Sequence, residues 1–173
     1  MKNILLTGAP GCGKTTIIKK VLEMLPQMNA AGFFTEEIRK GKVREGFKIT
    51  SLRGEEEIMA RVDIKSSNRV GKYKVDVEAV ENVGANSLIK GKASADIIII
   101  DEIGKMEAFS ELFKLSVLEA LQSKKLVLGT LTKAKDKFFQ DIKNREDVLI
   151  MEVTGKNRDK LPGEIVKLIE SRD

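Results

Sequence analysis

Histidine and tryptophan are absent from the 173-residue sequence, which has only one cysteine and one tyrosine. Without histidine, the chain has no imidazole base, no Ser-His-Asp triad and no His-based metal site. A general base must then be a carboxylate, a lysine or the substrate itself. The single cysteine, Cys12, excludes an internal disulfide framework and fits a reducing compartment.

Long hydrophobic runs are missing as well. The first apolar run is short and ends at a glycine-rich loop, unlike a signal peptide, and no later run approaches membrane-spanning length. We therefore expect a cytoplasmic protein with no membrane association. A length of 173 residues, with 42% hydrophobic and 33% charged residues, indicates one globular domain that covers residues 1–173.

The net charge of +5 is spread along the chain instead of being concentrated. Basic residues alternate with acids, as they do around Asp136, and stacking aromatic residues are few. Nucleic-acid surfaces usually concentrate positive charge and add aromatic side chains. We therefore expect a mixed-charge surface, a monomer, and no binding of nucleic acid.

Hydrophobic patterns predict alternating strands and helices, interrupted by a region rich in short β-type runs. The predicted strands are 2–7, 96–100, 125–130 and 148–153, the helices are 14–25, 77–89, 106–123, 134–145 and 161–172, and the short β-type runs are 33–39, 43–51, 57–63 and 73–75. This order predicts an α/β, three-layer P-loop NTPase fold with a mainly parallel central sheet flanked by helices. An antiparallel β insertion is expected around residues 38–75.

The segment GAPGCGKT, residues 8–15, follows the first strand and precedes the first helix. It matches G-x-x-x-x-G-K-[ST], in which glycines let backbone amides approach phosphates at the positive end of a helix. Lys14 is expected to contact the β- and γ-phosphates, and the Thr15 hydroxyl to bind Mg²⁺. The nucleotide-binding residues predicted from this loop are Gly8, Ala9, Pro10, Gly11, Cys12, Gly13, Lys14, Thr15 and Thr16.

A second polar segment ends the isoleucine-rich strand at residues 97–100. Asp101 is predicted to be the carboxylate on the Mg²⁺ side, and Glu102 to be the general base that takes a proton from water. Lys105 and Glu107 either line the same site or form a charge pair at a helix start. Asp101 to Gly104 also matches D-x-x-G, a motif of G proteins. Such proteins also need [NT]-K-x-D for guanine, and here Asp136 comes one residue too late after Thr132 and Lys133. This disfavours a GTPase switch.

Five segments occur in a characteristic order: GAPGCGKTT, GFFTEEIR at 32–39, VGKYKVD at 70–76, IIIIDEIGKME at 97–107 and VTGKNRD at 153–159. Together they resemble the small nucleoside-triphosphatase family of thermophilic bacteria and archaea, which includes the human cancer-related nucleoside-triphosphatase. The resemblance implies a single P-loop domain and slow, Mg²⁺-dependent hydrolysis of several nucleoside triphosphates, ATP and GTP among them. It also implies a structural likeness to kinases.

Two further sets of residues have both a functional and a structural interpretation. Glu37, Arg39 and Tyr73 either face a substrate or acceptor, or form a salt-bridged strand edge and a packed ring. Strand alternation places Glu37 and Arg39 on one face and Glu36 on the other. Asn157 and Arg158 follow the last strand and either contact the nucleobase, with little selectivity, or flank a helix.

Three functions are therefore compared. The leading hypothesis is hydrolysis of nucleoside triphosphates with Mg²⁺ as cofactor. The alternatives are a kinase that transfers the γ-phosphate to a small molecule or a nucleic acid, and a nucleotide-dependent switch that binds a partner.

Overall fold

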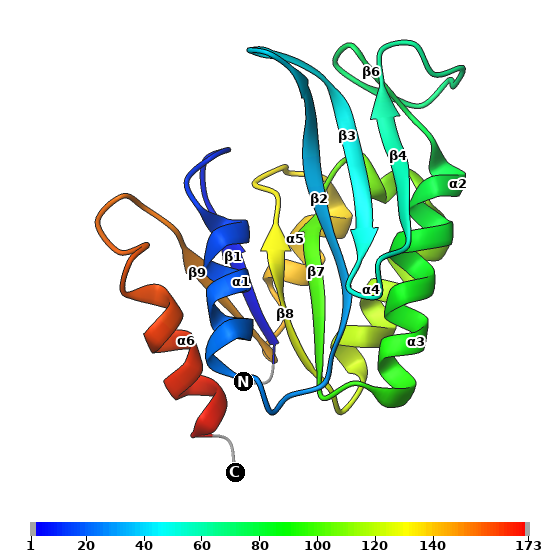
Figure 1. The fold of residues 1–173 in the computed structure, drawn as a ribbon. Coiled ribbons are helices and arrows are strands. Elements are labelled where there is room, and N and C mark those ends of the chain that lie inside the picture. Colours follow the sequence, from blue (N-terminus) through cyan, green and yellow to red (C-terminus); the bar gives the residue numbers. More distant parts are fainter. Residues whose placement is uncertain (1–2, 172–173) are drawn as a thin grey trace.

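The computed structural model describes residues 3–171, and within this range the strands form one nine-stranded sheet (Figure 1). The strand order is β5-β6-β4-β3-β2-β7-β8-β1-β9. The strands are β1 (Asn3–Thr7), β2 (Ala30–Lys40), β3 (Val43–Ser51), β4 (Glu56–Arg61), β5 (Arg69–Val70), β6 (Tyr73–Val75), β7 (Ile97–Ile103), β8 (Leu126–Leu131) and β9 (Val148–Glu152). The α/β fold class predicted from the sequence is confirmed.

One half of the sheet is parallel and follows the order β2-β7-β8-β1-β9. Its central strands are almost completely buried: β1 and β8 are buried along their whole length, and β7 is buried at all but one residue. Burial on both faces explains their continuous apolar sequences. The carboxyl ends of these strands meet at one edge of the sheet, at the top in Figure 1.

The other half of the sheet is antiparallel and corresponds to the predicted β insertion. β2 pairs in parallel with β7 through Ala30–Phe34 and antiparallel with β3 from Phe33 onward, so the insertion extends the central sheet directly. β4, β6 and β5 follow in antiparallel pairings. The β2–β3 hairpin and β6 rise above the ends of the parallel strands (Figure 1).

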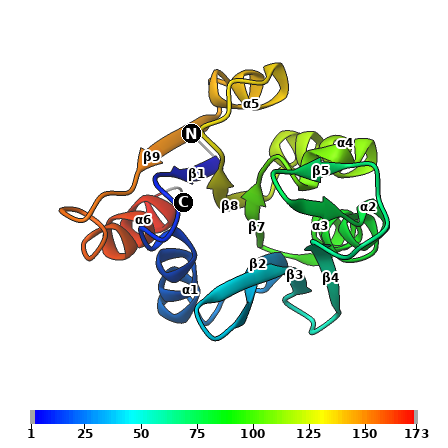
Figure 2. The ribbon, with the colours of Figure 1, turned by 90° about the horizontal axis from the view of Figure 1, so that it is seen from above.

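Helices cover both faces of the sheet (Figure 2). α1 (Lys14–Met24) and α6 (Leu161–Glu170) pack on one face, and α3 (Asn86–Ser94), α4 (Glu111–Gln122) and α5 (Lys137–Lys143) pack on the other. Alternate residues of β7 join the two cores: Ile97 and Ile99 face α1 and α6, while Ile98 and Ile100 face the opposite layer. This is the predicted three-layer arrangement.

The prediction that a helix begins at residue 106 and runs to 123 is wrong at its start. Residues Glu107–Phe109 form a 3₁₀ turn, η2, and α4 begins only at Glu111. The reason is a cap, because the Ser110 hydroxyl accepts a hydrogen bond from the Phe113 amide at 3.0 Å. A serine in this position starts a new helix instead of continuing the previous turn.

The predicted helix 77–89 is longer than expected and is not regular. It begins as α2 (Val77–Ala79), passes through a π-helical turn η1 (Val80–Ala85), and continues as α3 to Ser94. Gly84 lies in this turn, where a Cβ would come 3.0 Å from Ile49 and 3.6 Å from Phe113. Close packing of neighbouring side chains therefore explains the glycine that weakens the helical pattern.

The remaining bounds differ by a few residues. The predicted helix 134–145 is shorter and runs Lys137–Lys143, and Pro162 lies in the first turn of α6, as expected. Lys2 of the first predicted strand and Arg172 of the last predicted helix lie outside the described residues. No helix within residues 3–171 has the length and apolar character needed to cross a membrane.

Replacement of Ile99 by alanine tests the double-sided burial of β7. Ile99 is completely buried, so Ile99→Ala should lower the free energy of unfolding by about 2–5 kcal/mol. Ile89→Ala is the matched control because Ile89 is 41% exposed, and it should cost less than about 1 kcal/mol. Urea unfolding followed by circular dichroism measures both. Equal losses would contradict the assignment of Ile99 to the core.

Candidate active site

The phosphate loop joins β1 to α1 at the carboxyl edge of the parallel strands. Two glycines fix its course. Gly13, the residue before α1, has φ 107°, a conformation that favours glycine, and a Cβ on Gly8 would lie 2.8 Å from the Val153 carbonyl oxygen. The first hydrogen bond of α1 runs from the Ile17 amide to the Gly13 carbonyl at 3.0 Å. The amides of the first turn of α1, Lys14 to Thr16, therefore lie before the first bond of the helix ladder and can bind an anion.

Lys14 lies at the centre of this loop. Its ammonium donates hydrogen bonds to the carbonyl oxygens of Gly8 at 3.0 Å and Ala9 at 3.1 Å. The Cys12 sulfur is 3.9 Å from the same nitrogen. The charge of Lys14 is therefore held inside the curve of the loop.

Asp101, on β7, connects the phosphate loop to β7 and β8 through hydrogen bonds of its side chain. Its side chain is 3% exposed and accepts hydrogen bonds from the Thr15 hydroxyl at 2.6 Å and from the Thr130 hydroxyl at 2.7 Å. Burial raises the pKa of Asp101, and the two hydroxyl donors oppose that shift. The sequence pattern did not predict Thr130; its one signal is a hydroxyl group at the end of the apolar strand 125–130.

The pair formed by Thr15 and Asp101 fits a magnesium ion. Both offer oxygen atoms, which Mg²⁺ prefers, and they are already in contact. Among residues 3–171, no group of three or more acidic or cysteine side chains is placed to hold a metal by itself. Mg²⁺ usually binds few protein ligands and completes its coordination with phosphate oxygens and water, so two protein oxygens are enough.

Glu102 follows Asp101 across a cis peptide bond and is half-buried. Burial raises the pKa of its carboxyl group, the neighbouring charge of Asp101 raises it further, and Lys14 lowers it. A carboxyl group with a raised pKa is a better proton acceptor near neutral pH than an ordinary glutamate. The environment of Glu102 thus suits the role of general base predicted from the sequence.

Glu107 is a third carboxyl group beside this pair. It is only 3% exposed, and burial raises its pKa well above the usual range, with the charge of Glu102 as the second cause. A Cβ on Gly104 would lie 2.6 Å from a Glu102 oxygen and 2.7 Å from a Glu107 oxygen. Gly104 therefore allows these two carboxyl groups to approach one another, and Glu107 lines the site instead of forming a surface charge pair.

A cavity of about 680 Å³ brings these groups together with the β insertion. The predicted site residues that line it are Pro10, Gly11, Gly13, Lys14, Thr15, Thr16, Glu37, Tyr73, Asp101 and Glu102. Gly8, Ala9 and Cys12 are not part of this lining, and their contacts support the loop from within. Arg39 reaches the cavity only through Glu37, to which its Nε donates at 2.7 Å.

Asn157 and Arg158 lie in the loop between β9 and α6, outside this cavity lining. The Asn157 side chain bonds within its own loop: it accepts from the Thr154 amide at 2.8 Å and donates to the Glu152 carbonyl at 2.9 Å. The exposed Arg158 lies beside the phosphate loop, with its Cδ 3.9 Å from the Cβ position of Gly13. The predicted contact with a nucleobase is therefore better placed for Arg158 than for Asn157.

This chain is similar to known proteins over almost its whole length. A protein family described as NTPase matches residues 3–166. The chain is 48% identical over 167 residues to the nucleoside-triphosphatase THEP1 of Thermotoga maritima, covering 96% of this chain and 95% of the relative. It is 37% identical over 185 residues to the human cancer-related nucleoside-triphosphatase, covering 98% of this chain and 97% of the human protein.

Two solved structures also have a fold similar to this chain. The crystal structure of THEP1 from Aquifex aeolicus superimposes with a TM-score of 0.88 at 34% identity, over 97% of this chain and 99% of that one. The solution structure of the human cancer-related nucleoside triphosphatase has a TM-score of 0.84 at 36% identity, over the whole of both chains.

The burial of Glu107 predicts a pH-dependent stability difference. Because the folded protein keeps a proton on Glu107 that the unfolded chain releases, wild-type stability should fall as the pH rises from about 4.3 through the raised pKa. Glu107→Gln removes this loss, so its stability relative to wild type should increase between pH 4 and pH 8. Urea unfolding at several pH values measures the difference. Glu23→Gln, on the exposed face of α1, controls for the lost charge, and a pH-independent difference for Glu107→Gln would contradict the prediction.

Proposed function

The chain belongs to the NTPase family and is a nucleoside-triphosphatase, and we propose that it uses Mg²⁺ to hydrolyse several nucleoside triphosphates, ATP and GTP among them. The products are a nucleoside diphosphate and phosphate. The observation that carries this proposal is the cavity shared by Lys14, the Thr15–Asp101 pair and Glu102. It provides a phosphate-binding loop, oxygen ligands and a carboxylate base within one space.

Binding of the triphosphate depends on the loop and Lys14. The free amides at the start of α1 donate to phosphate oxygens, and the helix dipole favours their negative charge. Lys14 exchanges its bonds to the Gly8 and Ala9 carbonyls for the β- and γ-phosphates. These donors offset the charge that develops on the phosphoryl group as it is transferred.

In this proposal Thr15 and Asp101 would hold Mg²⁺ through their side-chain oxygens, which lie 2.6 Å apart. Once bound, the ion neutralises charge on the β- and γ-phosphate oxygens. Thr130 fixes the second oxygen of Asp101 at 2.7 Å, so the carboxylate cannot rotate away from Thr15. Thr130 is thus a positioning residue for the metal carboxylate.

Glu102 takes a proton from the attacking water. The water oxygen forms a bond to the γ-phosphorus, the bond from that phosphorus to the β–γ bridging oxygen breaks, and the diphosphate leaves with the electron pair. Burial and the charge of Asp101, which raise the pKa of Glu102, increase its basicity for this step. The broad base specificity in the proposal is supported by the position of Arg158, an exposed planar group that can stack on any base.

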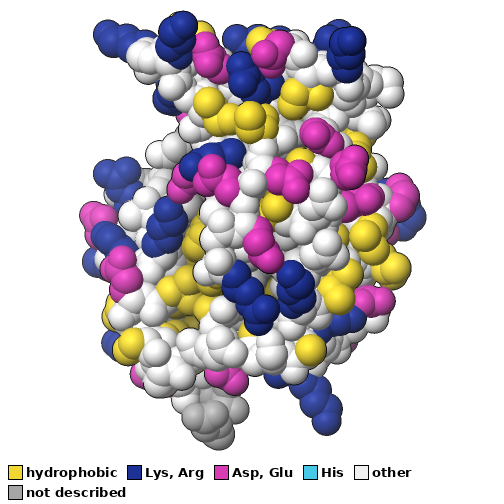
Figure 3. All heavy atoms as spheres, turned by 45° about the vertical axis from the view of Figure 1, so that its right-hand side comes forward, with side chains coloured by type: hydrophobic (Ala, Val, Ile, Leu, Met, Phe, Trp, Pro, Cys, Tyr) yellow, Lys and Arg dark blue, Asp and Glu magenta, His cyan; other side chains and the backbone are white. Residues whose placement is uncertain are grey.

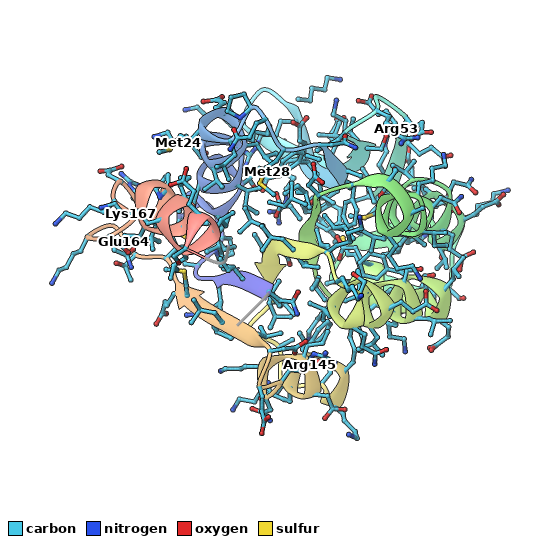
Figure 4. All side chains as sticks on the ribbon, turned by 90° about the horizontal axis from the view of Figure 1, so that it is seen from below. Met24, Met28, Arg53, Arg145, Glu164 and Lys167 are labelled. Carbon is cyan, nitrogen blue, oxygen red and sulfur yellow. The ribbon has the colours of Figure 1, made fainter. Side chains whose placement is uncertain are left out.

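Glu102→Gln tests the base. The amide keeps the shape of the side chain but cannot accept the proton, so kcat should fall by about 10²–10⁴-fold while binding of the triphosphate is retained. Phosphate release measures turnover, and fluorescence titration with a labelled ATP measures binding. Glu164→Gln is the matched control because the exposed Glu164 lies on α6 (Figure 4) and is not part of the cavity lining. Normal turnover by Glu102→Gln would exclude Glu102 as the base.

Phosphate release from ATP, GTP, CTP, UTP and their deoxy forms tests the cofactor and the specificity. With Mg²⁺, we expect turnover of all eight triphosphates within about one order of magnitude, since stacking on Arg158 discriminates weakly among bases. Addition of EDTA should remove turnover because the phosphate charge is then no longer neutralised. One dominant substrate would contradict broad specificity, and full activity in EDTA would contradict the role of Mg²⁺.

A further inference from the structure

A second cavity lies beside the active-site cavity, and the proposed hydrolysis does not use it. It measures about 480 Å³, which is within the size range of pockets that hold small molecules. Its walls come from the β5–β6 hairpin, the η2 turn and the first residues of α4 and α5. We call it the side cavity and define it by the charged and aromatic residues Arg69, Lys105, Phe109, Lys114, Asp136 and Phe138.

The β5–β6 hairpin brings Arg69 to the side cavity. Arg69 pairs with Lys74 across the hairpin, and Gly71 at the turn has φ 58°, a conformation that favours glycine. Seen from above, β5 lies beside α4 (Figure 2). The hairpin therefore places a cation from the β insertion next to side chains that follow the parallel strands.

The side cavity shares a wall with the active site but not its chemistry. Gly71 and Lys105 line both cavities, so the two spaces are neighbours. Lys14 and Glu102, in contrast, line only the active-site cavity. A molecule in the side cavity thus lies away from the phosphate loop and the proposed base, and the side cavity suits binding instead of catalysis.

The charge of the side cavity favours an anion. Three cations and the single acid Asp136 line it, which leaves two net positive charges, or one when the Glu111 partner of Lys114 at 2.6 Å is included. Within residues 3–171, the exposed Arg69 and Lys105 form no ion pair with a carboxylate. Figure 3 shows Lys and Arg side chains gathered at the top of the molecule, the end to which β6 rises in Figure 1. Positive charge in a concave site attracts anions.

The apolar part of the side cavity is aromatic. Phe109, the last residue of η2, is 38% exposed. The half-buried Phe138 packs edge to face on the buried Phe139 with centroids 5.4 Å apart, and the Lys114 ammonium lies 5.9 Å from the Phe138 centroid. One exposed aromatic residue is ordinary on a protein surface, but here two rings converge with unpaired cations on one cavity. This combination suits a flat ring that carries negative charge.

We propose that the side cavity binds an aromatic anion, a flat ring that carries a phosphate or a carboxylate group. Arg69 and Lys105 bind the anionic group, and Phe109 and Phe138 contact the ring. Both phosphate and carboxylate match the planar guanidinium of Arg69. The aromatic anion binds while a triphosphate occupies the active-site cavity, because the two ligands lie on opposite sides of the shared wall.

The fluorescent probe anilinonaphthalene sulfonate, an aromatic anion, tests this site. The full chain is titrated with the probe in the presence of Mg²⁺ and a saturating non-hydrolysable ATP analogue, which fills the active-site cavity. We expect saturable binding of one probe molecule per chain. Phenylnaphthylamine, which lacks the sulfonate, should bind about tenfold more weakly, because it forms no charged hydrogen bond. Loss of probe binding in the presence of the ATP analogue, or equal binding of phenylnaphthylamine, overturns the proposal.

Two variants connect the binding to the side cavity, and both change exposed residues that line this cavity alone. Arg69→Gln should raise the Kd of the probe about tenfold through the lost charge, and Phe109→Ala about two- to tenfold through the lost ring contact. The matched controls are Lys124→Gln, an exposed cation just before β8, and Leu115→Ala, which is 54% exposed on α4 outside the cavity lining. Both controls should keep the wild-type Kd. Circular dichroism verifies the fold of each variant, and an unchanged Kd in Arg69→Gln or Phe109→Ala contradicts the assignment.

Competition identifies the anionic group. Naphthyl phosphate and naphthylacetate are each titrated against the bound probe, and naphthol and inorganic phosphate are the controls that carry only the ring or only the anion. We expect displacement by at least one of the two aromatic anions, which shows whether phosphate or carboxylate is preferred, and about tenfold weaker displacement by either control. Displacement by neither aromatic anion, or equally by a control, overturns the proposal. The result does not depend on hydrolysis, since every measurement is of binding.

Discussion

The active site depends on one buried carboxylate, Asp101, and its two hydroxyl partners. Thr15 belongs to the first turn of α1, Asp101 to β7 and Thr130 to β8, so the hydrogen bonds at 2.6 and 2.7 Å join the phosphate loop to the two strands beside it. Burial would penalise an unpaired carboxylate strongly, and two hydroxyl donors reduce that penalty. The orientation of the two Asp101 carboxylate oxygens and the position of the adjacent Glu102 both follow from this arrangement.

Carboxyl groups in this site have different environments because they lie at different depths. Asp101 is stabilised by hydroxyl donors, whereas Glu107 is buried behind Gly104 with the charge of Glu102 nearby. Close acidic groups cannot all ionise without mutual repulsion, so burial favours a proton on Glu107. A neutral Glu107 leaves the negative charge on Asp101 and Glu102, the proposed metal ligand and base.

Long-range pairing accounts for the residues that were not predicted. The phosphate loop, Asp101 and Glu102 are recognisable from the sequence because each is defined by its immediate neighbours: a glycine pattern, a strand that precedes it, and a lysine. Thr130 carries no such local pattern, and neither do the contacts that place Arg44. Arg44 reaches the cavity through Tyr73, 29 residues away, and this contact exists because β4 and β6 bring the two side chains together.

The sequence by itself determined the α/β alternation, the phosphate loop and the polar residues that follow the strand at 97–100, since hydrophobic period and turn chemistry act over a few residues. It also determined that any base must be something other than histidine. The tertiary structure alone decided that the β insertion continues the central sheet and closes one side of the cavity. Strand register and side-chain packing between distant segments decide such features, and neither is encoded in a short stretch of residues.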